Sequence, residues 1–302
     1  MLEYSRCRGR AEIFLLLFVA SAWPAMRALA TDSDTFVTNV GGKVTIGGAN
    51  NLEEVDENFD LTSQIFYSPM QPGFPPFEPH DFGNDDPGFF ALGSDRVADF
   101  PSGTSPLPAG ASVTVHIPNF TVAGNTDKLF YWDGAGAVNF QPISTTQPGV
   151  ALAIGANPLG PTSSPSSGDT SFGALHQHPG FTLDNGGAGV PADGVYLNAA
   201  NISVTGLTDS KTYYNVWVID SLINDGDKVE DLRDALLTHA DPPIVDGKDF
   251  SFVNHAIGYV QSNLVSVPEP TTATLISVLA FIPFLSTSRR RKSAVCSFGG
   301  RS

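Results

Sequence analysis

The sequence predicts a mainly β protein: an antiparallel β-sandwich of the jelly-roll type, then a small helical hairpin and a C-terminal transmembrane helix. Between residues 31 and 220, short apolar or alternating runs recur, and turn-forming Gly, Asn and Asp residues separate them. This region carries no strong helical period. Many short strands with frequent turns are typical of an antiparallel sandwich or a related barrel. We therefore assign residues 31–220 to one β-sandwich domain.

The expected strands follow from these runs, and two stretches between them read as loops. The strands are Lys43–Ile46, Ser112–Ile117, Leu129–Trp132, Val150–Ile154, Phe172–Leu183, Val195–Val204 and Thr212–Ile219. Residues 71–90 are rich in Pro, Gly and Asp and are expected to form a long loop. Residues 160–169 read as a Ser/Pro linker.

The pattern changes after residue 220, where residues 221–265 favour two helices. Asp227 can cap the first helix, and Pro242-Pro243 would end it. Asp249 or Ser251 can cap the second. Apolar residues at helical spacing form one face of each helix. The hairpin would either pack on the sandwich or form a stalk above a membrane.

The N-terminus has the three parts of a secretory signal peptide. A basic start is followed by the apolar run Ile13–Ala22 and by Ala28-Leu29-Ala30, a cleavage site of small residues. We therefore expect residues 1–30 to be a signal peptide and the mature chain to begin at Thr31. Both cysteines, Cys7 and Cys296, lie in the terminal segments. The mature body would then contain neither a disulfide nor a cysteine-ligated metal.

The C-terminus carries a second targeting pattern in residues 266–292. Its exposed strip is Val267, Pro268, Glu269 and Pro270. Residues 271–288 are 18 uncharged residues, near the lower limit of roughly 17–25 for a membrane span. The basic cluster that follows is Arg289, Arg290, Arg291 and Lys292. By the positive-inside rule this cluster marks the cytoplasmic end, so residues 293–302 would be a cytoplasmic tail.

The order of Pro-Glu-Pro, short apolar segment and arginine cluster resembles the PEP-CTERM sorting signal of exported bacterial proteins. The resemblance implies export through the secretion translocon and processing by an exosortase-like membrane enzyme. It also implies transient anchoring through the C-terminus, and then a place at the cell surface or in the exopolysaccharide matrix. The chain departs from the family in that Ser293–Ser302 follow the basic cluster.

The charge of the mature body excludes one class of partner. Nine of the 16 basic residues, but only two of the 31 acidic ones, lie in residues 1–30 or 271–302. Residues 31–270 therefore hold 7 basic and 29 acidic groups, a net charge of −22. Such a body repels nucleic acid, which is bound through basic side chains. It could attract divalent cations, but an acidic solvated surface, which is common in secreted proteins, is the favoured explanation of the charge.

Two histidines form the best candidate site in the body. In a strand, His176 and His178 point to the same face, while the apolar residues around them face the core. Histidines two positions apart can offer two imidazoles to one metal ion. His116, on the polar face of another expected strand, is the preferred third ligand. Asp184 has the right parity but lies about 20 Å along an extended strand. A surface or hydrogen-bonded histidine pair without metal is the favoured reading of these two residues.

The same segment resembles a β domain of unassigned activity that recurs in PEP-CTERM proteins. The resemblance is carried by His176-x-His178 with the Gly-rich loop and Gly194–Leu197 after it, by residues 86–89 (DPGF) and by Leu129–Gly134. It transfers no catalytic residue.

Other chemistry is weakly indicated. The body has no cysteine nucleophile, no G-x-S-x-G elbow, no H-E-x-x-H and no P-loop. Residues 224–227 (NDGD) are oxygen-rich but fail the EF-hand spacing, so helix capping explains them better than calcium does. Aromatic residues that could line a sugar-binding face, but are expected to belong to the core, are Tyr131, Trp132, Tyr213, Tyr214 and Trp217.

These observations together favour an exported structural or adhesive protein without catalytic activity. A protein that binds a divalent metal through His176, His178 and His116 is one alternative. A glycan-acting hydrolase is the other, and it would need a cleft with paired carboxylates.

Overall fold

The structure is a computed structural model of the whole chain. It describes residues 30–31, 34–50, 58–73, 82–96, 99, 101–162, 174–186, 189–237 and 240–265. All of these belong to one compact unit that ends at Val265. The expected signal peptide up to residue 29, the sorting strip, the transmembrane segment 271–288, the basic cluster and the tail lie outside the described residues. Ala30, the last residue of the expected signal peptide, begins strand β1.

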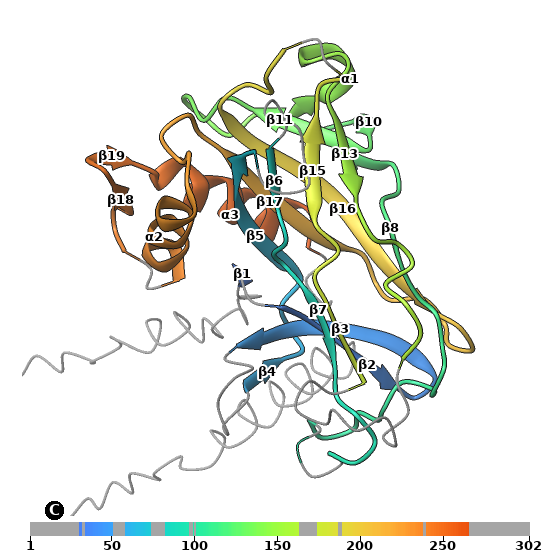
Figure 1. Cartoon of the computed structure of the whole chain (residues 1–302). Coiled ribbons are helices and arrows are strands. Elements are labelled where there is room, and N and C mark those ends of the chain that lie inside the picture. Colours follow the sequence, from blue (N-terminus) through green and yellow to red (C-terminus); the bar gives the residue numbers. More distant parts are fainter. Residues whose placement is uncertain are drawn as a thin grey trace, which may run out of the picture. The chain divides into compact units, whose positions relative to one another are not determined.

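The larger sheet has ten strands among the described residues, in the order β12-β11-β16-β17-β5-β6-β15-β13, with β1 on β5 and β8 on β16 (Figure 1). The strands are β1 (Ala30–Thr31), β5 (Ile65–Pro72), β6 (Phe82–Asn84), β8 (Val113–His116), β11 (Leu129–Trp132), β12 (Gln141–Pro142), β13 (Ala151–Ile154), β15 (Phe181–Asp184), β16 (Gly194–Val204) and β17 (Tyr213–Ile219). The long strand β16 pairs with different strands along its length. The first part of β16 pairs with β17 and its last part with β8.

The smaller sheet has five strands in the described chain, in the order β14-β7-β2-β3-β4. They are β2 (Asp34–Val40), β3 (Lys43–Asn50), β4 (Asn58–Asp60), β7 (Phe89–Ala91) and β14 (Leu175–Gln177). Two short hairpins complete the β structure: β9 (Phe120–Val122) with β10 (Asn125–Asp127), and β18 (Ile244–Val245) with β19 (Lys248–Asp249).

The mainly β class is confirmed, but the expected antiparallel arrangement of the jelly-roll type is wrong. Strand β5 runs parallel to both β17 and β1, and β2 runs parallel to β7. Both sheets are therefore mixed. The alternating pattern of a strand records which face is buried, whereas strand direction depends on distant connections.

Two further local predictions need correction. The expected loop over residues 71–90 contains β6 and β7. The expected strand Phe172–Leu183 is divided into β14 and β15. Pro179 cannot donate a backbone hydrogen bond, and Gly180 has a φ of 70°, so the chain turns between them.

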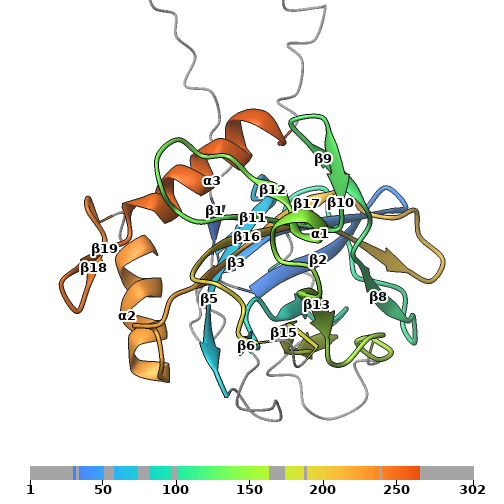
Figure 2. The ribbon, with the colours of Figure 1, turned by 90° about the horizontal axis from the view of Figure 1, so that it is seen from above.

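The two sheets share one hydrophobic cluster, which includes Val37, Ile46 and Phe89 of the smaller sheet and Phe66 and Trp217 of the larger one. A second cluster covers the other face of the larger sheet. There Val195 and Val216 of the sheet pack with residues of the helices α2 (Gly226–Leu237) and α3 (Ser251–Asn263) (Figure 2). The short helix α1 (Ile143–Thr146) follows β12.

The two expected C-terminal helices are thus present, and they pack on the sheet rather than forming a stalk. Leu232 and Leu236 of α2 and Val253 and Val260 of α3 are buried in the second cluster. The backbone N–H of Ser251 donates to Asp249 Oδ1 at 2.7 Å, but the N-cap position of α3 is Phe250, so the expected capping by Asp249 or Ser251 is wrong. None of the helices in the described ranges is long and apolar enough to cross a membrane.

Candidate metal centre

The site begins with the register of three strands in the smaller sheet. Phe36 of β2 pairs with Phe90 of β7, and Phe90 pairs on its other side with His176 of β14. Side chains two positions apart along a strand share a face. Asp34, Gly88 and His178 therefore form the next row, just beyond the paired ends. This face is opposite to Val37, Phe89 and Leu175, which belong to the main core.

An aromatic group supports the site from one side. Phe36 stacks on Phe59 with ring centroids 4.1 Å apart, and it also packs against Phe90. The edge-to-face contact between Phe90 and His176 has a centroid distance of 5.9 Å. These contacts restrict the rotation of the His176 ring, because aromatic pairs prefer defined geometries.

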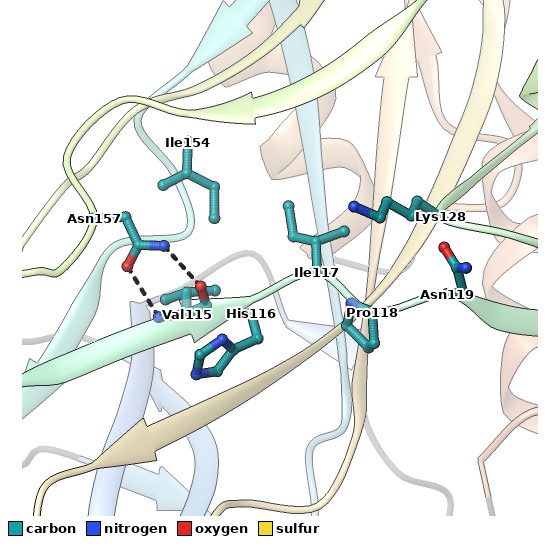
Figure 3. A pocket seen from close by; sticks show the side chains of 8 residues that line it. All are labelled: Val115, His116, Ile117, Pro118, Asn119, Lys128, Ile154 and Asn157. Carbon is teal, nitrogen blue, oxygen red and sulfur yellow. Dashed lines mark hydrogen bonds between the residues drawn. The ribbon is translucent and has the colours of Figure 1, made fainter.

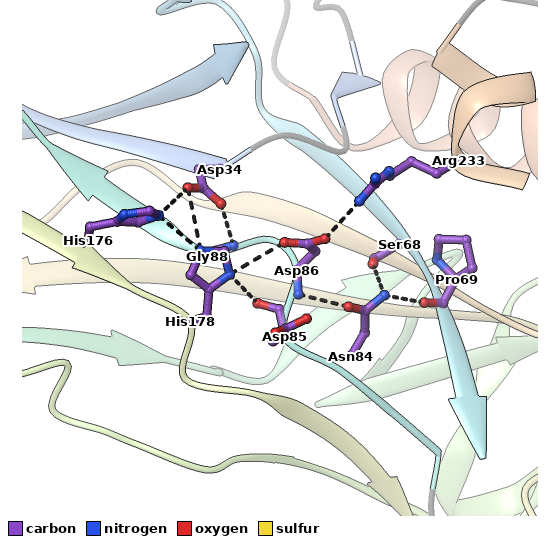
Figure 4. Close-up of polar contacts among 10 residues, drawn as sticks. All are labelled: Asp34, Ser68, Pro69, Asn84, Asp85, Asp86, Gly88, His176, His178 and Arg233. Atoms are coloured by element: carbon purple, nitrogen blue, oxygen red, sulfur yellow. Dashed lines mark hydrogen bonds and ion pairs between the residues drawn. The ribbon is translucent and has the colours of Figure 1, made fainter. Parts of the chain in front are cut away.

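Three ligand atoms converge on one point (Figure 4). The Nε2 atoms of His176 and His178 are 3.0 Å apart. Asp34 Oδ2 lies 3.2 Å from Nε2 of His176 and 3.8 Å from Nε2 of His178. Asp34 is only 7% exposed, and its other oxygen, Oδ1, accepts a hydrogen bond of 3.0 Å from the backbone N–H of Gly88. The carboxylate is therefore held by the fold, not by solvent.

The size of this triangle suits a transition-metal ion. Three atoms with these separations lie on a circle with a radius of about 2.0 Å, which matches the usual bond lengths from zinc to imidazole nitrogen and carboxylate oxygen. One ion can therefore contact all three atoms without a large movement. Imidazole with carboxylate suits Zn²⁺, Cu²⁺, Ni²⁺ or Fe²⁺, whereas Ca²⁺ and Mg²⁺ prefer all-oxygen sites.

Gly88 provides the space between the ligands. A Cβ atom at this position would lie 2.5 Å from Asp34 Oδ1 and 2.8 Å from His178 Nε2, closer than real Cβ contacts. The glycine just before β7 thus leaves a gap in the row, and the side chains of Asp34 and His178 on either side fill it.

The other nitrogen of His178 faces a second layer of polar groups. His178 Nδ1 lies 3.3 Å from the backbone oxygen of Asp85 and 3.5 Å from Asp86 Oδ1. Asp86 Oδ2 in turn accepts a hydrogen bond of 3.1 Å from Arg233 Nη1 of α2. The backbone N–H of Asp86 donates to Asn84 Oδ1 at 2.9 Å. His178 is thus linked through Asp86 to a helix that packs on the larger sheet.

The electrostatics of the site follow from burial and from these partners. Burial raises the pKa of Asp34, and the two histidines beside it oppose that rise. The Asp86 carboxylate raises the pKa of His178 to about 9, against a smaller opposing effect of burial. In the metal-free protein at neutral pH, His178 therefore carries a proton that an incoming cation must displace.

His116, the third ligand expected from the sequence, lies elsewhere. It belongs to β8 of the larger sheet, and its Nε2 is 2.8 Å from Ser203 Oγ. It lines an open pocket together with Ile117, Lys128 and Asn157 (Figure 3). The side-chain amide of Asn157 forms hydrogen bonds with the backbone N–H and carbonyl of Val115. Asp184 is also absent from the site, because its Oδ1 accepts a hydrogen bond from the backbone N–H of Gly186.

The other candidates have structural roles in the described chain. Trp132, Tyr213 and Trp217 are buried in the core, whereas Tyr131 and Tyr214 are half-buried, so the five aromatics do not form one exposed face. Asp225 Oδ1 accepts a hydrogen bond of 3.0 Å from the backbone N–H of Lys228 near the start of α2. This contact explains the acidic segment as a helix cap.

Sequence reasoning missed Asp34, Asp86, Gly88 and Arg233 as site residues. Asp86 and Gly88 lie in the Asp-Pro-Gly-Phe segment, which carries part of the resemblance but was assigned to a loop. Asp34 lies two positions before the buried Phe36 and so on the same strand face. This spacing could have indicated a site residue only if β2 had been predicted as a strand. Arg233 offers no local signal, because its contact with Asp86 spans 147 positions.

Comparison with known proteins yields no relative from which a role could be transferred: no family model, no curated protein and no solved structure matches the chain.

Proposed function

We propose that the chain is an exported protein of the cell surface or extracellular matrix whose folded body binds one divalent transition-metal ion. The observation that carries the metal proposal is the convergence of His176 Nε2, His178 Nε2 and Asp34 Oδ2 at separations of 3.0 to 3.8 Å. Two neutral imidazoles and one carboxylate give a typical zinc ligand set. A fourth coordination position would be left to water or to another donor.

We propose a structural role for the ion, although three protein ligands with an open fourth position are also the arrangement of catalytic zinc sites. It would join the start of β2 to the end of β14 across β7, and so close a long stretch of chain. Cross-links that close long loops reduce the entropy of the unfolded chain. Residues 31–270 contain no cysteine. A bound metal could therefore provide the cross-link that disulfides provide in other secreted proteins.

The hydrolase alternative has less support. A glycosidase needs two carboxylates that flank a cleft. The cavities lined by described residues around His116, around Trp132 and around Lys43 contain at most one carboxylate each. We favour a binding role because three possible metal-ligand atoms lie together at the histidine site.

The location of the protein is proposed from the sequence. The Pro-Glu-Pro strip, the 18 uncharged residues and the basic cluster support sorting by an exosortase-like enzyme after export through the translocon. The net charge of −22 over residues 31–270 supports a soluble cargo in the matrix. Contact with exopolysaccharide is part of this proposal.

Metal content and thermal stability test the metal proposal directly. Wild-type protein loaded with Zn²⁺ and dialysed is expected to retain one ion per chain. Its free energy of unfolding should rise by about 2.7 kcal/mol when free zinc is a hundredfold above Kd. The double variant His176→Ala/His178→Ala and the isosteric Asp34→Asn should lose the ion and the stabilisation.

His116→Ala is the matched control, because it removes a histidine of the same body that lies in the other sheet. It should keep full metal content. Equal retention of zinc by the double variant and the wild type would contradict the proposal.

A further inference from the structure

The two ring nitrogens of His178 have different neighbours, and the difference fixes the position of the hydrogen. Nδ1 faces the backbone oxygen of Asp85 at 3.3 Å and Asp86 Oδ1 at 3.5 Å. A carbonyl and an ionised carboxylate are acceptors only, so Nδ1 must carry a hydrogen. In the neutral ring, Nε2 then has the free lone pair, and Nε2 is the atom that faces Asp34 and His176.

Asp86 is itself held on its far side. Its two carboxylate oxygens are divided between partners: Oδ2 bonds Arg233 Nη1 at 3.1 Å, and Oδ1 faces His178. The Asn84 side chain fixes the backbone, since its Oδ1 accepts from the Asp86 N–H and its amide nitrogen donates to Ser68 Oγ at 2.8 Å. This arrangement leaves the carboxylate little freedom to turn away from the imidazole.

We propose that Asp86 is a positioning residue for the metal centre, which it serves by holding His178 with the hydrogen on Nδ1 and Nε2 toward the ion, while Arg233 of α2 holds Asp86. The proposal rests on the metal function proposed above. Carboxylates behind metal-binding histidines orient the ring and increase its basicity. In this protein the contacts continue from His178 through Asp86 to Arg233 of helix α2, which packs on the larger sheet.

Two other readings of the same atoms make different predictions. Asp85, Asp86 and His178 Nδ1 also lie close enough together to hold a second ion, in which case Asp86 would be a ligand. Alternatively, the Asp85 carbonyl alone could hold the Nδ1 hydrogen, and Asp86 would then contribute nothing to the ring's position.

The experiment compares Asp86→Asn, Asp86→Ala and Asp85→Asn in the full chain. Zinc affinity and stoichiometry are measured by competition with a chromophoric chelator, and nitrogen NMR of the histidine rings reports the His178 tautomer. Asp85→Asn is the matched control, because it removes an adjacent charge and keeps the backbone carbonyl. Metal-free unfolding curves establish that each variant folds, and the isosteric Asp86→Asn decides the question where Asp86→Ala is unstable.

We expect one ion per chain in every folded variant. Affinity should fall by about 10- to 100-fold in both Asp86 variants, the usual effect of removing such a partner, and stay near wild type in Asp85→Asn. Zinc-bound wild type should show His178 with the hydrogen on Nδ1, and Arg233→Met should weaken binding by a smaller factor.

The outcomes distinguish a failure of the positioning role of Asp86 from a failure of the metal function. Wild-type affinity in Asp86→Asn would overturn the positioning role and leave the metal function intact. Two ions per chain, with one lost in both Asp85→Asn and Asp86→Asn, would make Asp86 a ligand and equally overturn it. Absence of zinc binding by the wild type would remove the metal function itself.

Discussion

Gly88 and His178 lie so close that a Cβ atom added to the glycine would come within 2.7 Å of Cε1 of the imidazole. The proposed metal centre would therefore depend on a residue that offers no ligand atom. The residue before β7 contributes an empty position, and the first residue of β2 and the residue after β14 contribute the side chains.

Gly88→Ala should consequently impair the site. The new methyl group would force Asp34 and His178 apart, so we expect zinc affinity to fall at least tenfold and stability to drop by about 1–3 kcal/mol. Chelator competition and urea unfolding measure the two effects. Gly258→Ala in α3 is the control, because a Cβ there has no heavy atom within 4 Å. It should be neutral or stabilise the protein by up to about 1 kcal/mol. Unchanged zinc affinity in Gly88→Ala would contradict this account of the gap.

Zinc binding should strengthen as pH rises. The pKa of His178 is about 9 in the metal-free protein, above the ordinary 6.5, so a proton competes with the ion across this range. Apparent affinity should increase about tenfold per pH unit between 6.5 and 9 and then level off. Calorimetric titrations at several pH values test this slope. A flat profile over the same interval would contradict the displacement of a proton from His178 by the ion.

The stability of the metal-free protein should instead fall as pH rises. A raised pKa means that protonated His178 contributes stability that is fully present below pH 6.5 and is lost as pH rises toward 9. The contribution is modest, because the His178 side chain is 35% exposed. Comparing unfolding curves of wild type and His178→Gln across this range isolates the effect, which should vanish in the variant.

A buried hydrogen bond in the larger sheet gives an independent test of the fold. Trp217 Nε1 donates to Asn198 Oδ1 at 2.7 Å, and both residues are fully buried. Asn198→Ala leaves the indole N–H without an acceptor, so we expect a loss of about 2–4 kcal/mol when the cavity is included. Asn263→Ala removes an exposed hydrogen bond from a side-chain amide on α3 and should cost less than about 0.5 kcal/mol. Similar losses in both variants would argue against this pairing.

The sorting proposal predicts mislocalisation after small changes at the C-terminus. Glu269→Ala, or deletion of residues 289–292, should leave the protein in the membrane or cytoplasmic fraction instead of at the surface. Arg301→Ala is the control, since it removes a basic residue outside the cluster. Cell fractionation and immunoblotting measure where each form is found. Normal surface display of both altered forms would count against a sorting signal.

Strands with long alternating or apolar runs were predictable from the sequence. The expected Leu129–Trp132 coincides with β11, and the expected Val195–Val204 and Thr212–Ile219 each differ from β16 and β17 by one residue. Strands β6 and β7 were not predictable in this way. Each has three residues, too few to show a period, and prolines surround them.

The site was half predictable for the same reason. The shared face of His176 and His178 follows from local parity, and the 3.0 Å contact between their Nε2 atoms agrees with it. The third ligand is a matter of strand pairing. His116 has a polar-face position, but β8 joins β16 in the other sheet. Asp34 reaches the histidines because β2 runs parallel to β7, and such long-range pairing has no local signature.

The distribution of the ligands along the chain has a consequence for where the ion is acquired. In a chain that crosses the membrane unfolded, as export through the translocon implies, Asp34 emerges near the front and the two histidines much later. The proposed centre would then be complete only after more than half of the body has left the cytoplasm. The metals available outside the cell, and not those of the cytosol, would then decide which ion the protein carries, because intrinsic affinity alone favours copper over zinc at most nitrogen and oxygen sites.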